Sequence, residues 1–61
     1  MSDLLREIEL FCARHGMPPT RFGKLAMNDK AFVFALRAGR DVFTRTAAKV
    51  RRFMAEYSEE K

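Results

Sequence analysis

The chain has 61 residues, of which 48% are hydrophobic and 33% charged, and its net charge is +4. This length predicts a single small domain over residues 1–61, without room for a second lobe or a deep substrate cavity. The hydrophobic content excludes intrinsic disorder, and no stretch approaches the ~20 apolar residues that a membrane span needs. The N-terminus lacks the pattern of a signal peptide, and a lone cysteine fits the reducing cytoplasm, where we expect the protein.

The charges are distributed unevenly along the chain. Residues 1–13 and 53–61 each carry a net charge of −2, whereas residues 14–52 hold ten basic and two acidic side chains, a net charge of +8. A positive field concentrated in one part of a chain suits a polyanionic partner. The alternative is an ordinary solvated basic surface, which the charge alone does not exclude.

Four helices are expected, because apolar residues recur at helical spacing and no alternation typical of strands occurs. The first helix begins after Ser2, which can cap it, and ends at Gly16 in the left-handed conformation. Met17 follows at the position where a Schellman motif makes a hydrophobic contact back onto the helix, and Pro18 prevents continuation. The inward positions of this helix are Leu4, Leu5, Ile8, Phe11 and Cys12.

The second helix is short, with Thr20 as its cap and Arg21 to Met27 as its body. Gly23 lies inside it and weakens it, so we expect another backbone segment to approach closely at this position. The expected inward residues are Phe22, Leu25 and Ala26.

The third helix is expected from Lys30 to Ala38, after a turn at Asn28 and a cap at Asp29, and Gly39 ends it. The fourth helix opens at Thr44. Its inward face is marked by Ala47, Val50, Phe53 or Met54, and Tyr57. Two short consecutive helices joined by a turn of about two residues are typical of helix-turn-helix geometry.

Phe34 is the centre of the outward face of the third helix. At about 100° per residue, Phe32, Val33 and Leu36 define the inward sector, and Phe34 lies opposite. An α-helix fits the major groove of B-form DNA, where Lys and Arg bind guanine and apolar groups contact thymine methyls. We therefore expect base contacts from Lys30, Ala31, Phe34 and Arg37. The alternative is that Phe34 packs against a second copy or against the fourth helix.

Further residues are expected to orient Arg37 and to add phosphate contacts beside the outward face of the third helix. Asp41 can pair with Arg37 across one helical turn and hold it in place. Helix N-termini with a hydroxyl and a cation are natural phosphate sites, and the second and fourth helices both open in this way. The fourth helix also carries a stripe of cations that ends at Arg52, which alone could be a solvated face. The expected phosphate contacts are Thr20, Arg21, Lys24, Arg40, Thr44, Arg45 and Lys49.

The stretch PPTRFGKLAMNDKAFVFALRAGR resembles the small helix-turn-helix regulators of phage and proteobacterial genomes, relatives of the Cro and lambda-repressor class. FGKLA is similar to the Leu-Ala helix of that class, and FVFALRAGR is similar to the end of its recognition helix, where Gly39 follows Leu36. The spacing from Leu25 to Leu36 is shorter than in Cro-type proteins, and the usual turn glycine is absent. The resemblance implies an all-α, compact four-helix helix-turn-helix domain of the lambda-repressor type.

Together these features predict a sequence-specific, double-stranded DNA-binding transcriptional regulator, a phage-like repressor of the nucleoid, acting as a homodimer on a two-fold site. The runner-up is a protein-interaction adaptor or antitoxin that docks a partner through the Phe34 face, and a third alternative is a non-specific chromosome-coating protein. Cys12 and His15 are too few for a structural zinc site, and no nucleophile with a base or Gly-rich phosphate loop occurs. We expect no catalysis, cofactor, metal or small-molecule ligand.

Overall fold

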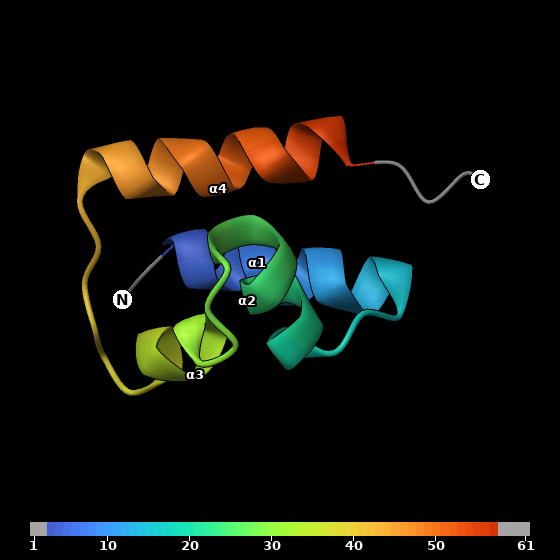
Figure 1. The fold of residues 1–61 in the computed structure, drawn as a ribbon, viewed down its shortest axis with the longest axis horizontal. Helices are drawn as coiled ribbons and strands as arrows, with labels where there is room; N and C mark the ends of the chain where they lie inside the picture. Colours follow the sequence, from blue (N-terminus) through green and yellow to red (C-terminus); the bar gives the residue numbers. More distant parts are fainter. Residues whose placement is uncertain (1–2, 58–61) are drawn as a thin grey trace.

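The computed structural model describes residues 3–57, which form four helices and, within that range, no strand. The helices are α1 (Asp3–His15), α2 (Pro19–Met27), α3 (Phe32–Arg37) and α4 (Thr44–Glu56). In Figure 1, α2 lies in front of α1, and α4 and α3 flank this pair on opposite sides. The expected all-α architecture is confirmed, whereas the expected cap Ser2 lies outside the described residues.

One side chain from each helix is fully buried at the centre of the core. These residues are Ile8, Phe22, Val33 and Val50. The rest of the buried core is formed by Leu4, Phe11, Met17, Ala26, Phe32 and Leu36. The inward faces predicted for α1, α3 and α4 are therefore confirmed, with Leu5, Cys12, Ala47, Phe53, Met54 and Tyr57 packed half-buried against the core.

An aromatic cluster joins α1, α2 and α4. It consists of Phe11, His15, Phe22, Phe53 and Tyr57. The ring centroid of Phe11 lies 4.3 Å from that of His15, 5.4 Å from Tyr57 and 5.6 Å from Phe22. Tilted and edge-to-face rings at such separations attract one another beyond their burial alone. The cluster thereby fixes Tyr57, which directly follows α4, against α1.

Two glycines end helices as predicted. Gly16 has a φ of 61°, and the N–H of Met17 donates to the carbonyl of Cys12 at 2.9 Å, which is the hydrogen bond of a Schellman motif. Met17 is buried, as that motif predicts. Gly39 ends α3 with a φ of 102°.

The start of α2 differs from the prediction. The helix begins at Pro19, so Thr20 lies inside its first turn and the expected Thr20 cap is wrong. The residue before the helix is Pro18, and no side chain caps the first turn. Proline is favoured at the first helical position because its φ is already helical and it has no N–H to satisfy.

Gly23 lies where α2 meets the chain that leads into α3. A Cβ at this position would collide with the carbonyl oxygen of Asp29 and lie 3.3 Å from Cβ of Phe32, so the expected close approach is confirmed. Leu25, expected to point inward, is instead 47% exposed. The buried sector of α2 runs from Phe22 through Ala26 to Gly23, where the chain leading into α3 approaches. Leu25 lies about 60° beyond the Phe22 edge of this sector and is therefore exposed.

α3 is shorter than predicted at both ends, because Lys30 and Ala31 form a turn before it and Gly39 follows soon after it. Asp29 was expected to cap this helix, but the N-cap residue of α3 is Ala31 and no side chain caps it. Asp29 stabilises the preceding turn instead: its Oδ1 accepts from the N–H of Ala31 at 3.0 Å, and its carbonyl accepts from the N–H of Phe32 at 3.1 Å. α4 begins at Thr44 as predicted.

Candidate nucleic-acid interface

The outward face of α3 has the orientation that the sequence predicts. Phe34 is 44% exposed, whereas Phe32, Val33 and Leu36 are buried. Lys30 and Ala31 are exposed in the turn that precedes the helix. All four expected base-contact residues, including Arg37, are therefore accessible from outside.

A shallow groove of about 360 Å³ brings together residues of α2 and the following turn. It is lined by Thr20, Arg21, Lys24, Leu25 and Lys30. Three expected phosphate contacts thus lie beside one expected base contact, although five residues of sequence separate Lys24 from Lys30. Leu25 was missed as a surface residue. The signal that could have found it is Gly23, because the side of a helix on which another backbone segment approaches is buried, and Leu25 lies about 160° away from Gly23 around the helix.

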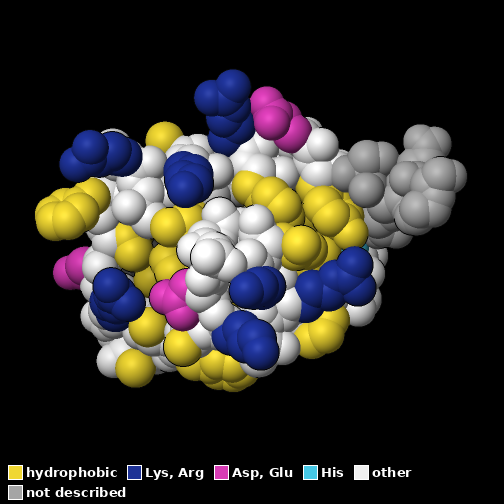
Figure 2. Space-filling model, viewed as in Figure 1, with side chains coloured by type: hydrophobic (Ala, Val, Ile, Leu, Met, Phe, Trp, Pro, Cys, Tyr) yellow, Lys and Arg dark blue, Asp and Glu magenta, His cyan; other side chains and the backbone are white. Residues whose placement is uncertain are grey.

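The remaining expected phosphate contacts lie on α4 and on the segment that leads into it. Arg40, Thr44, Arg45 and Lys49 are all exposed. On the side shown in Figure 2, Lys and Arg side chains are spread over α2, the chain between α2 and α3, and α4, whereas Asp and Glu are sparse.

Three arginines within residues 3–57 are ion-paired, whereas the other Lys and Arg side chains of this range, Arg6 and Arg14 on α1 among them, are not. Three arginines each bind a glutamate: Arg37 with Glu9, Arg51 with Glu7, and Arg52 with Glu56, at N–O distances of 2.8, 3.0 and 3.3 Å. Within residues 3–57, no ion pair involves the six basic residues that we call the cationic face: Arg21, Lys24, Lys30, Arg40, Arg45 and Lys49. Arg52, at the end of the expected stripe on α4, is thus partly neutralised, whereas no ion pair neutralises a residue of the cationic face.

Arg37 has a different partner from the one expected. Its Nε and Nη2 donate to the two carboxylate oxygens of Glu9 on α1, at 2.9 and 2.8 Å. The pairing with Asp41 was wrong because it required the helix to continue past Gly39, where the backbone turns away. The hydrogen bond from Arg37 lowers the pKa of Glu9 and raises that of Arg37. The guanidinium carbon of Arg37 also lies 5.4 Å from the ring centre of Phe34, a cation–π contact.

The described residues also bear on metal binding, thiol reactivity and membrane insertion. No group of three or more His, Cys, Asp and Glu side chains within it could hold a metal ion. Cys12 is half-buried against the core, and burial raises the pKa of its thiol, which disfavours the reactive thiolate. None of the helices in residues 3–57 has the length and hydropathy to cross a bilayer.

Comparison with models of known protein families gives no match, and comparisons with curated proteins and with solved structures give none either. The features of the molecule that bear on its function are therefore the cationic face, the exposed apolar side chains beside it and the ion pairs that border it.

Proposed function

We propose that the protein is a sequence-specific, double-stranded DNA-binding transcriptional regulator. α2 and α3 act as a helix-turn-helix unit, joined by the short turn at residues 28–31, and α3 with that turn enters the major groove. The arrangement that supports this proposal is the short helix α3 with one exposed face, preceded by α2, which packs against the core, and basic residues around both helices.

The observation that carries the proposal is the absence of ion pairs from the six residues of the cationic face, described for residues 3–57, whereas Arg37, Arg51 and Arg52 are each paired with a glutamate. Unpaired cations bind phosphates at no cost in broken salt bridges and release the condensed counterions of DNA. Thr20 and Thr44 add hydroxyl donors near the starts of α2 and α4, and Arg21, Lys24, Arg40, Arg45 and Lys49 supply the phosphate contacts.

Base recognition falls to the α3 face. Phe34 contacts a thymine methyl, and Lys30 and Ala31 approach base edges from the turn before α3. Arg37 binds a guanine through the same Nε and Nη2 atoms that now bind Glu9, so it exchanges one planar bidentate acceptor for another. Glu9 therefore holds the guanidinium extended beside Phe34 until DNA replaces it.

Two copies act on a two-fold site, because a single module of this size covers little DNA and gains affinity by pairing half-sites. Sedimentation of the complex with a selected duplex should give two chains per duplex. One chain per duplex at saturation would contradict the homodimer without affecting the interface proposed for each copy.

The central experiment is selection from a random duplex library, followed by fluorescence anisotropy of the selected site at several salt concentrations. We expect one enriched sequence, and we expect Arg45→Ala and Lys49→Ala each to reduce the slope of log affinity against log salt by about one. Arg14→Ala is the matched control, since Arg14 is an exposed arginine beside Glu7 and Leu10, outside the cationic face. An equal loss of slope in Arg14→Ala would show that the binding is diffuse and not localised to this face.

A second candidate function is favoured by one observation. Phe34 and Leu25 are 44% and 47% exposed, so each leaves a large apolar side chain accessible on the helix-turn-helix unit. An adaptor or antitoxin would bury both against a partner protein. Failure to enrich any duplex would favour this reading, and enrichment without sequence preference would favour a non-specific chromosome-coating protein.

A further inference from the structure

Leu10 of α1 is the most exposed large apolar side chain on the described helices, at 64%. It borders a groove of about 800 Å³ between α1 and α4. The apolar lining of this groove also includes Phe11, Ala13, Met54 and Ala55. The side of α1 that points away from the core therefore carries an apolar strip, outside the cationic face.

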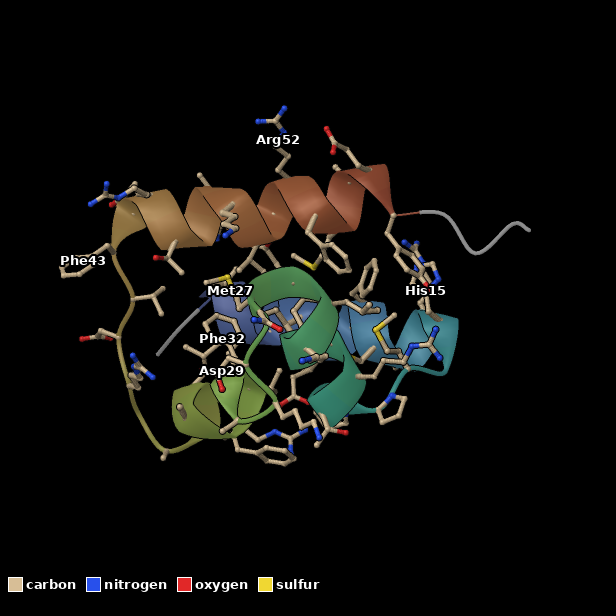
Figure 3. The ribbon with its side chains drawn as sticks, in the orientation of Figure 1. His15, Met27, Asp29, Phe32, Phe43 and Arg52 are labelled. Carbon is tan, nitrogen blue, oxygen red and sulfur yellow. The ribbon has the colours of Figure 1, made fainter. Side chains whose placement is uncertain are left out.

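Side chains of opposite charge lie on the two sides of Leu10 along α1. Glu7 lies about 4.5 Å before it and Arg14 about 6 Å after it along the axis, and the two are only about 20° apart around the helix. Arg14 has no ion pair within residues 3–57. Glu7 accepts from Arg51 at 3.0 and 3.1 Å, whereas the neighbouring Arg52 points away from the body of the molecule in Figure 3. A carboxylate has about four lone-pair sites, so Glu7 can accept from a further donor.

We infer that one face of α1 packs antiparallel against the same face of a second copy. This face, which we call the Leu10 face, is formed by Arg6, Glu7, Leu10, Ala13 and Arg14, all of them exposed. The two-fold axis passes beside Leu10, so the two leucines meet and each Glu7 faces Arg14 of the other copy. The inference rests on the homodimer of the proposed function and adds its interface.

The Leu10 face is complementary to itself, which favours a second copy over another partner. Arg6 and Ala13 lie about 20° apart on the other side of Leu10, so the stem of Arg6 packs over the small Ala13 of the second copy. Arg6 lies on the α3 side of the leucines and Arg14 on the α4 side, so these two arginines diverge. Each also lies about 12 Å along the axis from its own equivalent, which exceeds the screening length of about 8 Å. A parallel copy would instead bring each charge level with its own kind, and a polyanion would meet Glu7.

The antiparallel arrangement also suits a single duplex. Glu9 and Phe11 lie about 100° to either side of Leu10 around α1. Glu9 binds Arg37 of α3, and the ring centre of Phe11 lies 6.1 Å from that of Phe53 on α4. α3 and α4 are thus on opposite sides of the Leu10 face, in agreement with Figure 1. A two-fold axis that runs from the α3 side to the α4 side places both α3 helices on one side of the dimer.

Sedimentation equilibrium of the free protein over a range of concentrations tests this interface without DNA. The wild type should form a dimer, and Leu10→Ala should raise its dissociation constant roughly 100-fold, because the symmetry removes two buried leucine contacts at once. Arg14→Glu should raise the constant about tenfold by opposing two pairs of like charges, whereas Arg14→Ala loses only exposed ion pairs and should change it little. Leu25→Ala is the matched control, because Leu25 is 47% exposed but lies on α2. It should leave the constant unchanged.

Disulfide trapping tests the antiparallel register. In a Cys12→Ala background, Leu10→Cys places both thiols beside the two-fold axis, so oxidation should join the copies rapidly. Arg6→Cys is the control, since its thiols would lie about 12 Å apart, whereas the Cβ atoms of a disulfide are about 3.5–4.5 Å apart. Equal cross-linking rates for the two variants would overturn the arrangement.

The outcomes separate this interface from the proposed function. A wild-type dimer that Leu10→Ala does not weaken, or that Leu25→Ala weakens equally, would overturn the interface and leave the homodimer intact. A wild type that is monomeric at every concentration, with Leu10→Ala binding a selected duplex as tightly, would overturn it too. A dimer that Leu10→Ala dissociates, formed by a protein that selects no duplex, would support the interface and overturn the DNA-binding proposal. Melting curves of Leu10→Ala at concentrations where both proteins are monomeric should match wild type, since an exposed side chain adds little to the core.

Discussion

Gly23→Ala tests the contact that sets the angle between α2 and α3. A methyl group at Gly23 would meet the carbonyl oxygen of Asp29, which is backbone and cannot rotate aside. The turn must therefore move. It is held by the hydrogen bonds from Asp29 N–H to Gly23, from Ala31 N–H to the Asp29 carboxylate and from Phe32 N–H to the Asp29 carbonyl, at 3.0, 3.0 and 3.1 Å.

Two effects of opposite sign compete in this variant. Alanine favours the helical state over glycine by ~1 kcal/mol. Overpacking that displaces backbone costs ~1–3 kcal/mol, and each weakened hydrogen bond of the turn adds up to ~0.5–1.5 kcal/mol. The cost of the clash exceeds the gain in helix propensity, and we expect the free energy of unfolding to fall by ~2 kcal/mol. This lowers the melting temperature of a domain of this size by ~8–16 °C.

Thermal unfolding followed by circular dichroism at 222 nm measures this loss. Lys24→Ala is the control, because it changes helix propensity at a neighbouring exposed position of α2 without adding a contact. A Gly23→Ala protein that melts at or above the wild-type temperature would refute the reasoning, since it would mean that α2 and the turn before α3 do not touch at this point.

Further predictions concern the core, the ion pair and the groove. Leu36→Ala should lower the free energy of unfolding by ~2–5 kcal/mol, whereas Phe34→Ala should barely change it; equal losses would show that the helical phase of α3 is wrong. Glu9→Gln should raise DNA affinity, because Arg37 then has no carboxylate to leave. The control Glu7→Gln changes net charge equally but removes the carboxylate that binds Arg51, and an equal rise there would assign the effect to charge alone. Because the pKa of Glu9 is lowered, its pair with Arg37 stabilises the fold at pH values above the ordinary carboxyl pKa. The free energy of unfolding of the wild type should therefore fall as the pH falls through the lowered pKa, and Glu9→Gln should lack this decrease. Replacing one thymine of the selected site by uracil should weaken wild-type binding but leave Phe34→Ala binding nearly unchanged, and a thymine scan without such coupling would move Phe34 to a protein interface.

Local features of the fold were predictable from the sequence. The inward sector of α3 followed from residue spacing, and the helix ends at Gly16 and Gly39 followed from the conformations that only glycine adopts easily. The close approach at Gly23 was also predictable, because a glycine inside a short helix costs stability unless another segment requires the space.

Features that depend on contacts between distant segments were not predictable. Glu9 and Arg37 are 28 residues apart, and only the packing of α1 beside α3 brings them together. Local pairing rules instead favoured Asp41, because they assume a continuous helix. Leu25 was assigned to the core because helical spacing shows which side of a helix is buried but not how far around the helix the buried sector extends. The residues of the cationic face could be named from the sequence. Which other arginines are ion-paired could not, because two of the three glutamate partners lie on a different helix.

The four central core residues come one from each helix, and α3 itself has only six residues. An isolated helix shorter than ~12–15 residues is marginal in water, so α3 has no autonomous stability and exists as a helix only while the other three enclose Val33. Folding and the display of the α3 face are then one cooperative equilibrium. Heating should consequently abolish the exposed Phe34 surface and the helical signal at the same midpoint, and a fragment without α4 should present no ordered surface at all.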